Sequence, residues 1–238
     1  MCIRDRSYVI SSWDETALEA ALQITEDIGG EVTLLTIGPE KAAESLRKGL
    51  AMGAHKAIHV KYDDAKQTDS FAYARILQKV LEGREYDLIL AGKQSQDTDA
   101  GLTAPMLAEF LSLPQVTNII RYSDVSDQKM TLYRKGDHAT EVLEMELPGV
   151  VTVNDSLNEP RLASMRGIMM AKKKPLEEIE LDAIGISAEM SGAQGSMTEV
   201  LQYDKPESRK EGKSFEGDET DTVKQAIDLL VGEAKFLV

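Results

Sequence analysis

Apolar and polar residues follow one another along the first half of this chain in two different rhythms. Some segments carry apolar residues at three- and four-residue intervals, which is typical of amphipathic helices. Others are short, largely apolar runs, which are typical of strands buried on both faces of a parallel sheet. The predicted helices span residues 14–28, 69–82 and 99–111, with another after Gly38-Pro39, and the predicted strands span residues 31–37, 56–60 and 86–91.

This order of strands and helices predicts βαβ units with right-handed crossovers. We therefore expect an α/β fold with an open, mainly parallel twisted sheet flanked by helices. In the second half the pattern changes to strand-like segments separated by polar turns, which predicts an antiparallel insertion followed by a further buried strand and more extended structure. These segments are residues 116–122, 130–134, 140–146, 148–153 and 177–186.

The end of the chain differs in composition from the part before it. Residues 190–222 are rich in Gly, Ser, Glu and Lys with few large apolar residues, which predicts a linker or arm without a packed core. Residues 221–230 regain helical spacing and predict a terminal amphipathic helix that docks on a partner subunit. We therefore expect an α/β nucleotide-binding domain at 8–188 and a C-terminal arm at 189–238.

The chain is acidic, with a formal net charge of −14 over 238 residues. Against this background Lys172, Lys173 and Lys174 create a local field of opposite sign, which suits contact with an acidic partner. The alternative interpretation is a solvated charge run between two elements. A nucleic-acid-binding protein needs a basic face to neutralise phosphates, and this small cluster is the one candidate, so we do not expect nucleic acid as a partner.

Cysteine and histidine usage limits the chemistry. The single cysteine, Cys2, excludes an intramolecular disulfide and any site built from several cysteines, so redox chemistry would depend on a bound cofactor. His55 and His59 flank or lie in a predicted strand without a further ligand pattern, and we expect no metal site. No segment approaches the roughly 20 apolar residues that span a bilayer, so we expect an intracellular protein without a transmembrane segment.

A candidate anion site follows the third predicted strand. Gly92 and Gly101 allow a ligand to approach the backbone closely, and free amide groups at the start of the next helix can hold a phosphate. The alternative is that Asp97, Thr98 or Asp99 simply caps that helix. The chain has neither P-loop spacing nor a GxGxxG pattern, which argues against an NTPase or a standard dinucleotide site.

The most informative segment is residues 153–175, VNDSLNEPRLASMRGIMMAKKKP, which predicts an exposed loop with a short irregular run before its lysines. The combination of LNEPR, an apolar residue, IM and AKKK resembles the recognition loop of the electron transfer flavoprotein beta subunit. The resemblance extends from about Ser11 to Leu181 and implies an adenine-nucleotide alpha-hydrolase-like, Rossmann-like fold. Its other segments are Trp13-Asp14-Glu15, residues 49–54, and Gly92-Lys93-Gln94 with Asp97 and Thr103 behind it.

The resemblance implies a nucleotide in this subunit, either a structural AMP or a second FAD as in electron-bifurcating relatives. The chain departs from the family where Leu102 replaces a glutamine, Gly101 an asparagine, and Ser11-Ser12 an Asn-Pro pair. These changes remove side-chain hydrogen bonds and leave the backbone amides. The residues implied to bind the nucleotide are Ser11, Ser12, Trp13, Asp14, Ile37, Gly92, Lys93, Gln94, Ser95, Gln96, Asp97, Thr98, Asp99, Ala100, Gly101, Leu102 and Thr103.

The resemblance also implies protein partners. In that family the beta subunit forms a heterodimer with an alpha subunit that holds the redox-active FAD. Electrons pass from acyl-CoA or related dehydrogenases, as in fatty acid beta-oxidation, to a quinone oxidoreductase-type acceptor, and an apolar residue at the position of Met165 enters a pocket of the dehydrogenase. The residues implied to contact partners are Leu157, Asn158, Glu159, Pro160, Arg161, Met165, Lys172, Lys173 and Lys174.

The start of the chain does not follow the family. Family members begin with a short apolar strand, and residues 1–7 do not match it. We therefore expect that strand, and one edge of the nucleotide site with it, to be absent.

The resemblance implies the cytoplasm of a bacterium or archaeon, or the mitochondrial matrix of a eukaryote. No nucleophile elbow or Ser-His-Asp arrangement is recognisable, so we expect an electron carrier subunit without catalysis of its own. The alternative is a standalone adenine-nucleotide-binding protein or a nucleotide-dependent enzyme of the same α/β class.

Overall fold

The computed structural model describes residues 8–63, 67–96, 98–202, 204–205 and 212–232. The chain divides into two compact units, Met1–Val200 and Leu201–Val238. Residues 1–7, where we expect the family's first strand to be absent, lie outside the described residues. The separate roles expected for residues 8–188 and 189–238 stay a prediction.

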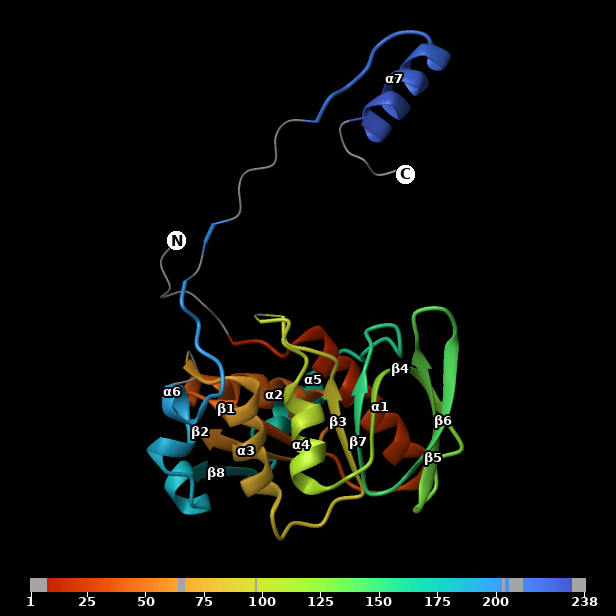
Figure 1. Cartoon of the computed structure of the whole chain (residues 1–238). Helices are drawn as coiled ribbons and strands as arrows, with labels where there is room; N and C mark the ends of the chain where they lie inside the picture. Colours follow the sequence, from red (N-terminus) through yellow and green to blue (C-terminus); the bar gives the residue numbers. More distant parts are fainter. Residues whose placement is uncertain (1–7, 64–66, 97, 203, 206–211, 233–238) are drawn as a thin grey trace. The chain divides into compact units, whose positions relative to one another are not determined.

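The first unit holds the α/β part of the chain, and the second contains the helix α7 (Glu219–Gly232) (Figure 1). The helices of the first unit are α1 (Ser12–Ile28), α2 (Ala43–Met52), α3 (Ser70–Leu81), α4 (Thr103–Leu111), α5 (Met165–Ala171) and α6 (Gly192–Gly195), with short 3₁₀ turns at Glu40–Ala42, Leu181–Ile184 and Ala188–Met190. Its strands are β1 (Thr33–Gly38), β2 (Lys56–Lys61), β3 (Leu88–Gly92), β4 (Gln115–Ser123), β5 (Lys129–Lys135), β6 (Thr140–Glu146), β7 (Gly149–Val153) and β8 (Leu176–Glu180).

The described strands form two sheets. The strands of the first sheet are parallel, in the order β1-β2-β8. The second sheet has the order β3-β7-β4-β5-β6, in which β3, β7 and β4 are parallel and β5 and β6 continue as antiparallel strands. The predicted α/β class and antiparallel insertion are confirmed, and the parallel strands are divided between two sheets instead of forming one.

Alternate residues of β7 explain how helices cover both faces of the second sheet. Val151 and Val153 pack in one hydrophobic cluster with Ala17 of α1, whereas Val150 packs in another with Ala104 of α4. Because successive side chains of a strand point to opposite faces, α1 and α4 cover opposite faces of the sheet. All of β7 is buried, as its continuous apolar sequence predicts.

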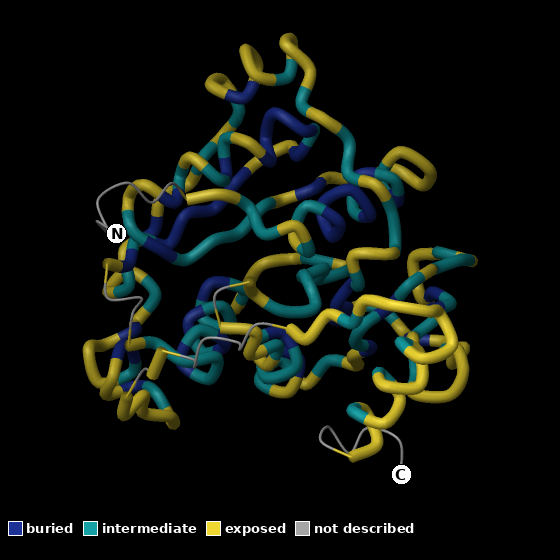
Figure 2. The backbone as a smooth tube through the Cα atoms, turned by 90° about the horizontal axis from the view of Figure 1, so that it is seen from above, coloured by how far each residue is buried: buried dark blue, intermediate teal, exposed yellow. Residues whose placement is uncertain are grey.

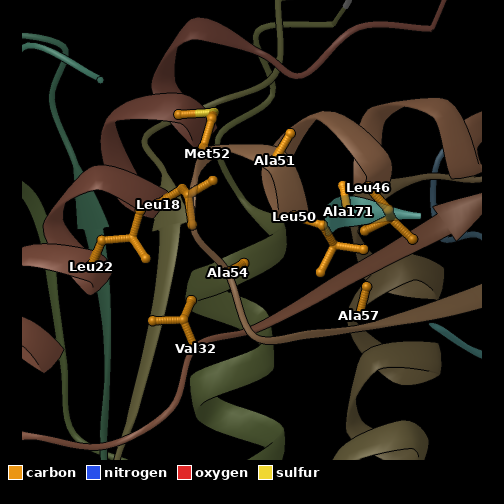
Figure 3. Packing of buried hydrophobic residues seen from close by; sticks show 10 residues of the cluster. All are labelled: Leu18, Leu22, Val32, Leu46, Leu50, Ala51, Met52, Ala54, Ala57 and Ala171. Carbon is orange, nitrogen blue, oxygen red and sulfur yellow. The ribbon is translucent and has the colours of Figure 1, made fainter. Parts of the chain in front are cut away.

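A further hydrophobic cluster joins α1, α2 and α5 (Figure 3). Leu50 of α2 is fully buried in it, and Leu18 of α1 and Ala171 of α5 belong to the same cluster. The irregular run expected before the lysines is therefore wrong, because residues 165–171 form a helix. Packing of its small residues against α2 stabilises a segment whose own sequence gives too short a helical pattern to detect.

The predicted start of the fourth helix at residue 99 is also wrong. Asp99 and Gly101 have φ angles of 53° and 61°, in the left-handed region, which interrupts a right-handed helix. The helix α4 therefore begins at Thr103, immediately after this turn.

The segment after β8 is less extended and better packed than its sequence predicts. The strand ends at Glu180 and a 3₁₀ turn follows, so the expected extended segment 177–186 is only partly a strand. Further on, the N–H groups of Met197 and Thr198 donate to the Asp69 carboxylate at 2.8 and 3.0 Å. The first residues of the expected arm, up to Val200, thus belong to the first unit.

Buried residues of the first unit gather in β2 and β7 and on the inner sides of α1, α2 and α3, and Figure 2 shows buried backbone in dark blue beside exposed segments in yellow. The predicted helix at 221–230 is confirmed as α7. It has no buried residue, and Val223, Ile227, Leu230 and Val231 are exposed on it.

In the part of the chain that the structure describes, no helix is both long and apolar enough to cross a membrane.

Candidate functional site

The loop after β3 lies against the start of α1. The Gly92 N–H donates to Asp14 Oδ1 at 2.9 Å, and the Gln96 side-chain amide donates to Ser12 Oγ at 2.8 Å. A Cβ atom on Gly92 would lie 2.7 Å from the Cβ atom of Trp13, so glycine is required for this close approach. Gly92 and Asp14, which are 78 positions apart in the sequence, are thus brought together as predicted residues of one site.

Two polar atoms at this place are buried without a hydrogen-bond partner among the described residues. They are Ser11 Oγ and Trp13 Nε1. Ser11 is the N-cap residue of α1, yet its side chain makes no capping bond. Buried polar groups are normally paired, so these atoms fit the edge of a site for a polar ligand. Nearby, desolvation of the Asp14 carboxyl raises its pKa more than the hydrogen bond from Gly92 lowers it.

A cavity of about 260 Å³ lies between this loop and the strands β4 and β7. At its wall Asn118 has a φ of 59°, which is uncommon for a residue other than glycine and concentrates at functional sites. The Asn118 N–H donates to Thr152 Oγ1 at 2.9 Å, and the Asn154 amide donates to Asn118 Oδ1 at 2.9 Å. The lining residues are Lys93, Gln94, Asp99, Ala100, Gly101, Pro105, Thr117, Asn118 and Thr152.

The sequence analysis missed the residues that β4 and β7 contribute to this cavity. Thr117 and Asn118 interrupt the register of β4 against β7, since the pairing shifts between Val116 and Ile119. An asparagine inside an apolar strand was the available signal, because asparagine is depleted in strands and tolerates the left-handed conformation.

The helix α4 begins without a side-chain cap. Its N-cap residue is Leu102, so the amide groups of Thr103 and Ala104 receive no capping bond from that side chain. Asp99 instead accepts from the Gln94 amide at 2.8 Å, and Thr98 shares a hydrogen bond with a neighbouring serine. The alternative in which Thr98 or Asp99 caps the helix is therefore wrong. Uncapped amides at a helix start attract an anion.

Two predicted site residues stand apart from these groups. Ile37 lies near the end of β1 and packs against the hydrophobic cluster that contains Ile58 and Val60. It belongs neither to the contacts around Gly92 nor to the cavity lining. Asp97 lies outside the described residues.

The LNEPR segment is held on α1. Arg161 donates to the Glu19 carboxylate from its Nε, Nη2 and backbone N–H at 2.7, 3.0 and 3.1 Å, and it also pairs with Glu26. The Asn158 amide donates to the Thr16 carbonyl at 3.0 Å. The Glu19 side chain is only 5% exposed. Arg161 and Asn158 therefore attach the segment to the helix, a function that is distinct from displaying charge to solvent.

The ion pair shifts the pKa values of its members. Burial acts to raise the pKa of Glu19, but hydrogen bonds from Arg161 and Gln23, together with the charge of Arg161, outweigh burial and hold that pKa below its ordinary value. Hydrogen bonds with Glu26 and Glu19 raise the pKa of Arg161. The pair is therefore ionised at neutral pH.

The helix α5 is seated closely on α2. Ser164 caps α5 by accepting from the Gly167 N–H at 3.0 Å, and a Cβ atom on Gly167 would lie 2.3 Å from the Ala51 carbonyl oxygen. Arg47 of α2 donates to the Ala171 carbonyl at 2.9 Å. The two helices thus approach through small residues and shared hydrogen bonds.

Lys174 completes this attachment. Its Nζ donates to the carbonyl oxygens of Leu50, Gly53 and Ala54 at 2.9, 3.2 and 2.6 Å. A lysine at this place satisfies carbonyl groups at the C-terminal end of α2 and complements the helix dipole. Burial lowers the pKa of Lys174.

The outer side of α5 is apolar and exposed. Met165 is 77% exposed, and it shares a helix face with Ile168 and Met169 because they follow at three and four positions. A contiguous apolar surface on a protein marks an interaction site, and methionine adapts to the shape of its partner. We call this the α5 surface, and it consists of Leu162, Met165, Ile168, Met169 and Met170.

Residues 1–184 match the family profile of the electron transfer flavoprotein domain. The chain belongs to this family. The resemblance identified from the sequence is confirmed, and family membership gives the chain a general role in electron transport as part of a flavoprotein.

The relatives of this electron transfer flavoprotein chain are beta subunits. It is 35% identical to the electron transfer flavoprotein subunit beta of Bacillus subtilis (strain 168), over 97% of this chain and 88% of that protein. It is 39% identical to the subunit of the same name from Mycobacterium leprae (strain TN), over 94% and 86% of the two chains. The subunit of Methylophilus methylotrophus is 37% identical over 84% and 77%. The chain is thus similar to beta subunits along most of its length.

Proposed function

We propose that the chain acts as the beta subunit of a heterodimeric electron transfer flavoprotein. Its alpha subunit would hold the FAD that carries electrons from dehydrogenases to a quinone oxidoreductase-type acceptor. The observation that carries this proposal is the exposed α5 surface on an acidic chain of this family. This chain would contribute docking and a nucleotide-binding scaffold.

We propose further that the loop at residues 92–103 binds AMP, or a second FAD in a bifurcating protein. The close backbone approach at Gly92 and the uncapped amides of Thr103 and Ala104 suit a phosphate group. The unpaired Ser11 Oγ and Trp13 Nε1 suit a polar group of the same ligand. A bound FAD would supply electron storage, whereas AMP would have a structural role.

Docking through the α5 surface is supported by its combination of apolar residues and nearby cations. An apolar anchor provides contact area, and charges speed the encounter without making it long-lived. A carrier that visits several dehydrogenases needs such brief contacts. Acyl-CoA or related dehydrogenases are the proposed donors.

Met165→Ala is expected to lower kcat/KM about tenfold for electron transfer from a purified acyl-CoA dehydrogenase to the heterodimer, because truncating a central anchor removes much of an interface's energy. The rate is measured by flavin reduction in stopped flow. Met197→Ala is the matched control, since Met197 is 74% exposed outside the α5 surface. An unchanged rate for Met165→Ala with every dehydrogenase donor would contradict this docking role.

Gly92→Ala is expected to reduce the nucleotide content of the heterodimer, because the new Cβ atom would displace the start of α1 from the loop. Mass spectrometry of small molecules released from the co-expressed subunits separates one AMP and one FAD from two FAD. Gly232→Ala, in open space, is the control. A chain that purifies alone and hydrolyses ATP would instead favour the nucleotide-dependent enzyme.

A further inference from the structure

The four cations expected to fringe the docking loop do not have equivalent surroundings. Arg161 makes three hydrogen bonds to Glu19 and also pairs with Glu26, so its charge is compensated within the chain. Lys174 directs its ammonium group to three carbonyl oxygens of the α2 C-terminal end. Neither charge is free to attract a partner without breaking these contacts.

Lys172 and Lys173, the other two of the four, are exposed next to the α5 surface, and so is Arg166, which was not among the expected residues. Within the described residues, none of the three has a side-chain hydrogen bond or an ion pair. Arg166 lies in the first turn of α5 next to Met165, and Lys172 and Lys173 follow directly after Ala171, where the helix ends. Positive charge therefore lies near both ends of the apolar residues of α5.

We propose that Arg166, Lys172 and Lys173 form the charged fringe that selects partners, and that Arg161 and Lys174 are positioning residues that hold the α5 surface on α1 and α2. This inference rests on the proposed docking function and deepens it. Arg166 is new to the set of residues proposed to contact partners. It lies beside Met165, and the sequence analysis did not assign it a role. The partner that fits is a protein with a small apolar pocket bordered by carboxylates.

Charge complementarity supports this choice of partner. The chain carries a net charge of −14, so an acidic protein is repelled by most of its surface. Three uncompensated cations next to the apolar anchor give such a protein one attractive approach, and this favours a single docking orientation. Charges already neutralised by Glu19 and Glu26 add little to that long-range field.

The test uses the co-purified heterodimer and a purified acyl-CoA dehydrogenase, with kcat/KM measured from about 0.02 to about 0.3 M ionic strength, over which screening changes severalfold. Arg166→Gln, Lys172→Gln and Lys173→Gln are each expected to lower kcat/KM about threefold at low salt and to flatten its salt dependence. The charge-neutral double variant Arg161→Gln with Glu19→Gln is expected to keep the wild-type slope and lower the melting temperature. Lys174→Gln is expected to lower the melting temperature, because three carbonyl groups lose their donor. Lys135→Gln, an exposed lysine on β5, should change neither quantity.

The outcomes separate this inference from the docking function itself. If Met165→Ala slows electron transfer but the charge-neutral Arg161→Gln, Glu19→Gln double variant flattens the salt dependence as much as Arg166→Gln does, the division between fringe and positioning residues is overturned while docking stands. A triple Arg166, Lys172 and Lys173 glutamine variant with the wild-type slope also overturns it. If the wild-type heterodimer accepts no electrons from dehydrogenases, the proposed function and this inference fail together.

Discussion

Arg161→Ala is expected to lower the free energy of unfolding by about 3 kcal/mol, because it leaves the buried Glu19 carboxylate without its cation. Glu19 is 5% exposed, and Arg161 also supplies the contact that ties the LNEPR segment to α1. Urea unfolding followed by the fluorescence of Trp13, the chain's single tryptophan, measures the loss. We expect Glu19→Gln to lose less than Arg161→Ala, because a neutral amide needs no counter-ion.

The pH dependence of this loss follows from the pKa of Glu19. In the wild type that pKa lies below its ordinary value, so the pair stabilises the fold above about pH 4.3, the unfolded pKa, and the contribution disappears as pH falls through the folded pKa. In Arg161→Ala the backbone N–H of residue 161 and the Gln23 amide still donate to Glu19, but the guanidinium hydrogen bonds and charge are gone, so desolvation counts for more and protonation relieves the buried charge. The stability difference between the two proteins should therefore be greatest at neutral pH and shrink on acidification.

The matched control is Arg134→Ala. Arg134 forms an ion pair with Glu141 across β5 and β6, but both side chains are more than a third exposed. Exposed pairs contribute about 0–1 kcal/mol, so this variant should lose far less stability. If the Arg134 and Arg161 variants lose the same free energy of unfolding, the Arg161–Glu19 pair stabilises the protein no more than an exposed ion pair does.

Gly167→Ala is expected to lower the free energy of unfolding by about 2 kcal/mol and to weaken docking, although it leaves every residue of the α5 surface unchanged. Its Cβ atom would lie 2.3 Å from the Ala51 carbonyl oxygen, which is backbone and cannot rotate away. The helix α5 must therefore move off α2. Thermal melting measures the first effect, and kcat/KM for a dehydrogenase donor measures the second.

Gly232→Ala provides the comparison for this variant. A Cβ atom on Gly232 meets no atom within 4 Å, so the same substitution should change stability by less than about 0.5 kcal/mol. A Gly167→Ala protein with wild-type melting and wild-type electron transfer would contradict the proposed close seating of α5.

The elements predicted best from the sequence are those with a long or strongly apolar pattern. The helix at 14–28 and the strand at 148–153 agree with α1 and β7 within two residues at each end. The helix α5 was missed because its seven residues give less than two full turns of pattern and its stability depends on contact with α2. Local patterns identify an element only when it is long enough to repeat.

The candidate site likewise has parts that a local pattern predicts and parts that depend on tertiary contacts. The loop from Gly92 and the run of three lysines could be located from adjacent residues alone. The contributions of Asn118 and Thr152 could not, because they depend on the pairing of β4 with β7. The left-handed backbone conformation of Asn118 left a single local sign in the sequence, an asparagine inside an apolar strand.

The sequence by itself determined the α/β class and the family and located the loop after β3 that we propose to bind a nucleotide, because each was recognised from short segments of adjacent residues. Only the tertiary structure decided which cations face solvent. Arg161 meets the Glu19 carboxylate across 142 positions, and Lys174 donates to carbonyl groups at the end of α2 across more than 100, so both cations are held by partners that no local pattern links to them. A charge acts on its surroundings through distance in space, and distance in space is set by the fold.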